Sequence, residues 1–197
     1  GIRTTVFFKG CPLHCTWCHN PETQCYNPEV EFDSEKCVGC GSCISVCHTG
    51  AISIVDGKAF TDSNKCDRCD KCGKMCPSSA RRVMGKDYEP KALVKELMKD
   101  LMFYEESGGG VTLSGGEVMM MDIDYLLAIA KELKLNGISL FIDTCGYVPY
   151  ERLSEILPYT DTFLYDLKCM DDDRHKKYTG VSNEKILDNL ARLSKDG

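Results

Sequence analysis

Residues 4–18 read TTVFFKGCPLHCTWC, a short β-rich run that leads directly into three cysteines. β-branched and aromatic residues dominate the start of this stretch, which is typical of a strand. Cys11, Cys15 and Cys18 have the spacing C-x3-C-x2-C, so one short loop offers three thiolates. Three thiolates can hold three corners of a 4Fe–4S cluster and leave one iron open for a substrate, as the open position does in catalytic zinc sites. A zinc knuckle, or a cluster completed by Cys25 or a distant thiol, is the alternative on spacing alone.

Two further cysteine runs share the spacing C-x2-C-x2-C-x3-C, which is the spacing of two-cluster ferredoxins. In that pattern the fourth cysteine of each run binds the other cluster. One predicted ligand set is Cys37, Cys40, Cys43 and Cys76, and the other is Cys66, Cys69, Cys72 and Cys47. A pair of zinc sites is the alternative, but structural zinc sites use separated cysteine pairs. The repeated spacing also indicates an internal duplication.

The number and spacing of the cysteines limit which cellular compartment and which cysteine chemistry are plausible. Of 197 residues 14 are cysteine, and eleven of these stand in the three groups, where disulfides between such close neighbours are geometrically awkward. Metal binding in a reducing compartment, the cytoplasm, is the better interpretation. A formal net charge of −6 argues weakly against nucleic acid as a partner. No apolar run approaches the roughly 18 residues of a membrane span, so no membrane partner is expected.

The remainder of the chain predicts alternating helices and strands. After the first strand, helices are expected from Pro90, over 124–136, over 150–157 and over 182–195, with strands at Val111–Ser114, Ile138–Asp143 and Thr162–Leu167. In the first helix the apolar residues at helical spacing are Leu93, Val94, Leu97, Leu101 and Met102. Four strands alternating with four helices predict the α/β class with a parallel sheet. The cysteine-rich residues 25–85 are expected to form an inserted α+β, ferredoxin-like domain, which leaves 1–24 and 86–197 for the βα domain.

Polar motifs follow three of the predicted strands. They are Ser114-Gly115-Gly116-Glu117, Asp143-Thr144-Cys145-Gly146 and Asp166-Leu167-Lys168. In parallel βα folds the carboxyl ends of the strands meet at one rim, where ligands bind. Together with the first cysteine loop, these motifs therefore predict a single site. For each motif taken alone, an ordinary glycine turn or a solvated rim is the alternative.

Other polar residues give no catalytic pattern. Surface or structural roles are expected for the histidines, and ordinary small-side-chain roles for Cys25, Cys145 and Cys169. The acidic run Asp171–Asp173 predicts a solvated helix start, where negative charge is favourable. The chain starts at Gly1 immediately before a strand and stops at Gly197 immediately after a predicted helix, so we expect a fragment cut at both ends.

Together these motifs resemble the glycyl-radical enzyme activating enzymes of the radical SAM superfamily. The resemblance rests on the stretch from Gly1 to Cys11 and on to Glu22, the two ferredoxin-like runs, and the three strand-end motifs. It implies a partial (β/α) barrel of the radical SAM type, with S-adenosylmethionine on the open cluster at the strand ends. Only four of the six βα units of that family are present. Val118 stands where the family usually has proline.

The resemblance also implies residue roles. Cys11, Cys15 and Cys18 would bind the catalytic cluster, and Trp17 would lie near the adenine of S-adenosylmethionine. The methionine amino group would be held by Gly115, Gly116 and Glu117. Lys168 would pair with the carboxylate of S-adenosylmethionine. Asp143, Thr144 and Asp166 match positions that bind a monovalent cation in some relatives. No side chain is expected to act as a general base, because the cofactors carry the chemistry.

The implied activity is that of an oxidoreductase with three 4Fe–4S clusters. It would cleave S-adenosylmethionine reductively to methionine and a 5′-deoxyadenosyl radical, which takes a hydrogen from a glycine of a partner glycyl radical enzyme. A flavodoxin or ferredoxin would donate the electron. The insert resembles those of activators of glycerol or diol dehydratases, choline or isethionate lyases, hydroxyproline dehydratase and arylacetate decarboxylases. The alternatives are a radical SAM enzyme acting on a small molecule or peptide, and a pure electron-transfer protein.

Overall fold

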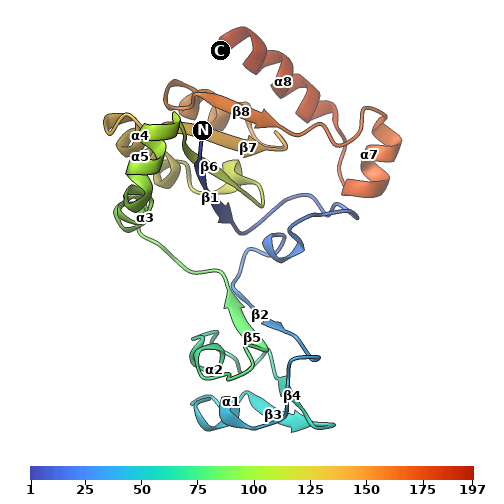
Figure 1. The fold of residues 1–197 in the computed structure, drawn as a ribbon. Helices are drawn as coiled ribbons and strands as arrows, with labels where there is room; N and C mark the ends of the chain where they lie inside the picture. Colours follow the sequence, from blue (N-terminus) through green and yellow to red (C-terminus); the bar gives the residue numbers. More distant parts are fainter. The chain divides into compact units, whose positions relative to one another are not determined.

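The computed structural model describes residues 1–197, which form two compact units (Figure 1). Gly1–Tyr26 and Asp87–Gly197 make up the first, here named the βα unit. The second, Asn27–Lys86, is named the cysteine-rich unit. The sequence placed the insert at 25–85, one or two residues from these bounds.

The βα unit is built on four parallel strands in the order β1-β6-β7-β8. They are β1 (Arg3–Phe8), β6 (Gly110–Gly115), β7 (Ser139–Thr144) and β8 (Thr162–Tyr165). Each strand pairs with the next strand of this unit along the chain, so right-handed crossovers put the helices on the same face. That is the arrangement of an open (β/α) barrel and not of a doubly wound sheet. The predicted α/β class with a parallel sheet is confirmed, although β8 ends at Tyr165 and not at Leu167.

The helices differ from the prediction in two places. They are α3 (Pro90–Leu97), α4 (Leu101–Ser107), α5 (Ile123–Leu135), α6 (Tyr150–Ile156), α7 (Asp172–Thr179) and α8 (Glu184–Asp196), with 3-10 turns at Pro21–Thr23, Met98–Asp100, Val118–Met120 and Leu157–Tyr159. The turn at Met98–Asp100 interrupts the single helix expected from Pro90, and Met102 is exposed and not part of the apolar face. The four expected helices omitted α7, although the acidic run predicted a helix start there. None of the helices combines the length and hydrophobicity of a membrane span.

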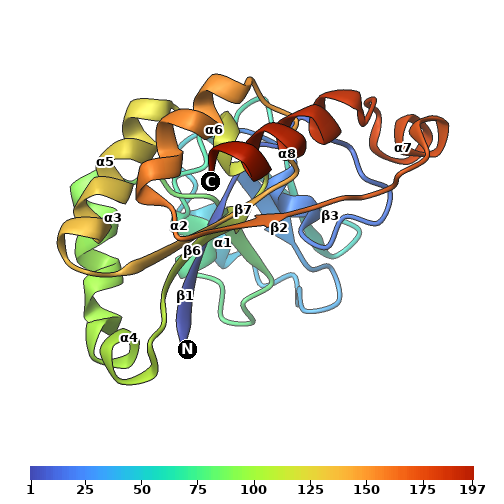
Figure 2. The same cartoon turned by 90° about the horizontal axis from the view of Figure 1, so that it is seen from above.

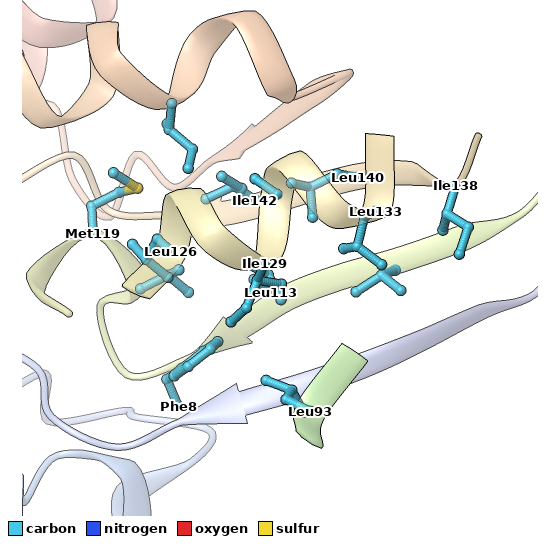
Figure 3. Packing of buried hydrophobic residues seen from close by; sticks show 14 of the residues in the cluster. Phe8, Leu93, Leu113, Met119, Leu126, Ile129, Leu133, Ile138, Leu140 and Ile142 are labelled. Carbon is cyan, nitrogen blue, oxygen red and sulfur yellow. The ribbon is translucent and has the colours of Figure 1, made fainter. Parts of the chain in front are cut away.

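A continuous hydrophobic core joins the helices to the sheet (Figure 3). Leu126, Ile129 and Leu133 of α5 recur at helical spacing and are fully buried, as are Leu113 of β6 and Ile142 of β7. Figure 2 shows α5, α6 and α8 along one side of the strands. Burial of each such side chain contributes roughly 1.5–3 kcal/mol, so the core fixes the positions of the strand ends.

The cysteine-rich unit consists of two antiparallel ribbons and two short helices. The ribbons are β2 (Glu29–Phe32) with β5 (Arg81–Met84) and β3 (Ile52–Val55) with β4 (Lys58–Thr61), and the helices are α1 (Ser42–Ser45) and α2 (Lys71–Lys74). An offset of 29 residues, the distance from Cys37 to Cys66, also relates α1 to α2 and β3 to β5. The same offset relates three pairs of residues with positive φ: Gly39 and Arg68, Gly41 and Asp70, and Gly50 and Ser79. The two halves therefore share one backbone conformation.

The core of the cysteine-rich unit is small. Its buried hydrophobic residues are Cys37, Cys43, Ile52, Ala59 and Ala80, packed against Phe32 and three further cysteines. Two of these five are cysteines and two are alanines, so the unit buries little apolar surface of its own. The unit therefore draws little stability from its own apolar side chains.

Candidate functional site

A cleft of about 320 Å³ opens at the carboxyl ends of the four parallel strands. Its lining includes every residue for which the sequence predicted a role at the catalytic cluster or at S-adenosylmethionine: Cys11, Cys15, Trp17, Cys18, Gly115, Gly116, Glu117, Asp143, Thr144, Asp166 and Lys168. It also includes six others: Leu13, His19, Asn20, Gln24, Ser114 and Cys145. The structure thus brings four separate stretches of the chain into one site.

The loop that carries the first three cysteines is anchored through its backbone. Near its start, the amide of Gly10 donates to the carbonyl of Thr23 at 2.7 Å. Further along, the amide of His14 donates to Thr179 at 2.8 Å, and that of Thr16 donates to Tyr178 at 3.0 Å. The backbone carbonyls of the last two residues of α7 therefore anchor the cysteine loop. The sequence did not reveal this role of the helix.

The Gly-Gly turn after β6 brings the backbone close to this loop. The amide of Glu117 donates to the carbonyl of Gly10 at 2.8 Å. A Cβ on Gly116 would lie 2.2 Å from that same carbonyl oxygen, and Gly115 has a φ of +105°. A side chain at Gly116 would displace the start of the cysteine loop, and one at Gly115 would be strained and would clash with the backbone of Phe8 in β1.

The carboxylate of Glu117 is buried and joins two strand ends. One oxygen accepts from the hydroxyl of Thr144 at 2.6 Å and from the amide of Met119 at 3.0 Å, and the other accepts from the amide of Cys145 at 2.7 Å. Burial raises the pKa of Glu117, and these donors oppose the rise because they stabilise the anion. The side chain is therefore a buried hydrogen-bond acceptor held in a fixed position beside the cleft.

Two more carboxylates lie on the rim of the cleft. Asp143 accepts a hydrogen bond of 2.6 Å from the hydroxyl of Ser114, and Asp166 forms an ion pair with Lys168. Burial works to lower the pKa of Lys168, but the contact with Asp166 and the nearby thiols outweigh it, so the pKa is raised. Lys168 thus keeps a positive charge near the thiol of Cys15.

The three thiols of the loop fit a metal cluster. No cysteine of the chain forms a disulfide. Burial, with the nearby Glu117, Cys15 and Cys18, raises the pKa of Cys11 to about 11, so a nearby cation would be needed to hold this sulfur as a thiolate at neutral pH. Cys25 does not line the cleft, and the Cys145 thiol, which does, hydrogen-bonds to Glu117. This leaves the three thiols of the C-x3-C-x2-C loop as the cysteines of the cleft that are available to a metal.

The cysteine-rich unit contains a second thiol-lined cavity. Four of its lining residues are Cys37, Cys40, Cys43 and Cys76, which is the first of the two predicted crossed ligand sets. The amide of Ala80 donates to the sulfur of Cys76 at 3.3 Å, and hydrogen bonds of this kind stabilise sulfur ligands. Four thiols with such donors fit a 4Fe–4S cluster.

Comparison with known proteins gives the family. The model described as "Radical SAM superfamily" matches residues 63–197, and that described as "4Fe-4S binding domain" matches residues 30–53. The chain belongs to the radical SAM superfamily. The predicted membership is confirmed, and with it the expectation of S-adenosylmethionine and 4Fe–4S chemistry.

Among its radical SAM relatives are several activating enzymes. The trans-4-hydroxy-L-proline dehydratase activating enzyme of Clostridioides difficile is 53% identical over all of this chain and 65% of its own length. The (2S)-3-sulfopropanediol sulfolyase activating enzyme of Bilophila wadsworthia is 44% identical over 98% of the chain and 65% of its own length. The choline trimethylamine-lyase activating enzyme of Oleidesulfovibrio alaskensis is 43% identical over 98% of the chain and 63% of its own length. The chain thus spans less than two thirds of these relatives.

Some residues of the radical SAM cleft had no predicted role. Cys145 is the clearest, since it is only 7% exposed and contacts Glu117. Its place in the strand-end motif Asp143-Thr144-Cys145-Gly146 was the available signal. His19, Asn20 and Gln24 line the cleft from the segment after the cysteine loop and stand in no such motif.

Proposed function

We propose that this chain is the catalytic part of a glycyl-radical enzyme activating enzyme. The observation that carries the proposal is the single cleft in which three thiols of the C-x3-C-x2-C loop face a Gly-Gly turn, three carboxylates and Lys168. The names of the relatives, all activating enzymes, support it.

In the proposed reaction S-adenosylmethionine takes up one electron and its carbon–sulfur bond breaks. Methionine and a 5′-deoxyadenosyl radical result, and the radical removes one hydrogen atom from a glycine of a partner enzyme. Cys11, Cys15 and Cys18 would hold a 4Fe–4S cluster, which would supply the electron and bind the amino and carboxylate groups of the substrate. The products are 5′-deoxyadenosine and a glycyl radical on the partner.

The residues of this chain bind and orient the substrate. Gly115, Gly116 and Glu117 hold the methionine amino group, with the buried carboxyl group of Glu117 beside it. Lys168 pairs with the carboxylate, and Trp17, half exposed at the cleft, contacts the adenine. A monovalent cation is proposed to bind at Asp143, Thr144 and Asp166, whose oxygen atoms suit such an ion.

We also propose two 4Fe–4S clusters in the cysteine-rich unit, which makes three in all. One is held by Cys37, Cys40, Cys43 and Cys76, and the other by Cys66, Cys69, Cys72 and Cys47. Unpaired thiols at this density require a reducing compartment, so we place the protein in the cytoplasm. A flavodoxin or ferredoxin of that compartment would supply the electrons.

Anaerobic reconstitution of the full-length protein tests the proposal. We expect about twelve irons per chain from three four-iron clusters. With dithionite, the protein should release 5′-deoxyadenosine, and Cys15→Ala should lose about four irons and this activity, whereas Cys40→Ala should keep the activity. About eight irons with no 5′-deoxyadenosine from the unmodified protein would contradict an enzymatic function.

The partner is tested separately. In the presence of a glycyl radical enzyme encoded beside this protein, a glycine radical should appear in its electron paramagnetic resonance spectrum. Deuterium from that glycine should also appear in 5′-deoxyadenosine. Deuterium acquired only from a small molecule or a short peptide would favour the alternative radical SAM function.

A further inference from the structure

Arg81, the first residue of β5, carries a buried charge whose hydrogen-bonding groups the protein satisfies only in part. The residue is only 3% exposed. One terminal nitrogen, Nη2, donates to the hydroxyl of Thr61, but Nε and Nη1 are buried without a hydrogen-bond partner. A buried guanidinium in this state is strongly unfavourable, so an anionic or sulfur acceptor is expected next to it.

The cavity beside Arg81 is the one lined by the first thiol set. Arg81 shares its lining with Cys37, Cys40, Cys43 and Cys76. The guanidinium therefore lies beside the ligands of the first proposed cluster.

The internal duplication shows that the position does not require a cation. An offset of 29 residues matches Arg81 with Ile52, the first residue of β3, which is 6% exposed. The preceding residues, Ala51 and Ala80, are identical and both buried. One half of the unit thus places an apolar side chain where the other half buries a charge.

We propose that Arg81 sets the reduction potential of the cluster held by Cys37, Cys40, Cys43 and Cys76. Its unsatisfied N–H groups donate to the sulfur atoms of that cluster, and its positive charge stabilises the form that has gained one electron. Net charge and hydrogen bonds to sulfur are the features that tune such potentials. The cluster at Arg81 therefore takes up an electron more readily than it would beside an isoleucine. This inference rests on the proposed clusters of the insert and not on the glycyl radical reaction.

A potentiometric titration of the reconstituted full-length protein, followed by electron paramagnetic resonance, tests the proposal. Arg81→Ile introduces the residue of the matched position. At a fixed potential we expect the ratio of reduced to oxidised cluster to fall about tenfold, which equals a shift of about 59 mV for one electron. Arg81→Lys, which keeps the charge, should show a smaller shift.

Arg82→Ile is the matched control, because it removes the same charge one residue away. Arg82 is exposed and pairs with Glu31, so solvent screens it and its loss should leave the potential unchanged. An unaltered potential in Arg81→Ile at full iron content would overturn the proposal, as would an equal shift in Arg82→Ile. If Arg81→Ile does not retain iron, the reduction potential is measured in Arg81→Gln, where a fall supports the proposal and an unaltered value overturns it. Loss of iron from both would also overturn it, because Arg81 would then act on assembly and not on potential.

The same preparations keep the two proposals distinguishable. Absence of 5′-deoxyadenosine from the unmodified protein would count against the proposed function, whereas the potentials of the insert clusters remain measurable in that protein.

Discussion

The carboxylate of Glu117, just past the end of β6, accepts a hydrogen bond of 2.6 Å from the hydroxyl of Thr144 at the end of β7. The same carboxylate holds the amide of Cys145, so one buried side chain joins two neighbouring strand ends. This contact fixes the Gly-Gly turn relative to the second polar motif of the rim. Its removal should therefore affect both stability and the cleft.

Thr144→Val keeps the shape of the side chain and removes the donor to Glu117. A buried acceptor that loses its partner costs about 1–3 kcal/mol, so the free energy of unfolding should fall by about that amount. The affinity for S-adenosylmethionine, measured without reductant, should fall as well. Ser154→Ala, which removes a hydroxyl bonded to a carbonyl on the outside of α6, is the control and should change stability by less than about 0.5 kcal/mol. An equal fall in the free energy of unfolding in Thr144→Val and Ser154→Ala would contradict a special role for the contact between Thr144 and Glu117.

The sequence predicted which residues lie at the carboxyl ends of the strands, but it did not predict the hydrogen bonds among them. Parallel strands place their carboxyl ends together, so polar residues after three strands were expected to meet. Which donors Glu117 finds depends on the register of β6 and β7 and on the turn at Gly116, and neither has a sequence signal. Cys145, expected as an ordinary small side chain of the strand-end motif, is buried at this contact, which the motif alone did not predict.

The start of α7 was predicted from its acidic run, but its extent was missed for a different reason. Only His175 and Thr179 of this helix are buried, so it has no apolar face to produce a helical pattern. The Asp171 side chain caps it, accepting from the amide of Arg174 at 2.8 Å, and its last carbonyls bind the cysteine loop. Polar contacts of this kind stabilise a helix without leaving the periodicity on which prediction relies.

Removal of iron should loosen the cysteine-rich unit and spare the βα unit. The first has a core of cysteines and alanines, whereas the second has a continuous core of leucine, isoleucine and valine. After anaerobic chelation we expect fast hydrogen exchange of backbone amides in β3 and β4 and unchanged protection in β6 and β7. Restoration of iron is the control and should restore protection. Protection in β3 and β4 that survives chelation would show that the unit folds without metal.

Pairs of cysteine variants should reveal the crossed ligation. Cys40 and Cys76 line one cavity, so Cys40→Ala with Cys76→Ala should damage a single cluster and leave about eight irons. Cys40→Ala with Cys47→Ala should damage both insert clusters and leave about four. The two double variants are matched controls for each other, because each removes two thiols of the same unit. The opposite order of iron contents would mean that each run binds its own cluster.

The aromatic contact between Trp17 and Tyr178 should support the adenine side of the cleft. The two rings lie 5.5 Å apart, and Trp17 is half exposed at the cleft, so Tyr178 on α7 limits the orientations that Trp17 can adopt. Aromatic pairs of this kind contribute about 0.5–1.5 kcal/mol, so Tyr178→Ala should weaken binding of S-adenosylmethionine about 2- to 10-fold. Trp17 is the only tryptophan, so its emission can follow the titration alongside equilibrium dialysis.

Tyr178→Phe is the matched control, because it keeps the ring and removes only the hydroxyl. Both substitutions leave the backbone carbonyl of residue 178 free to accept from the amide of Thr16, so the anchoring of the cysteine loop should persist in each. Binding close to that of the unmodified protein in Tyr178→Phe, with weaker binding in Tyr178→Ala at full iron content, would assign the effect to the ring contact. Equal weakening in both variants would instead assign it to the hydroxyl, and Tyr178 would then not act by positioning Trp17.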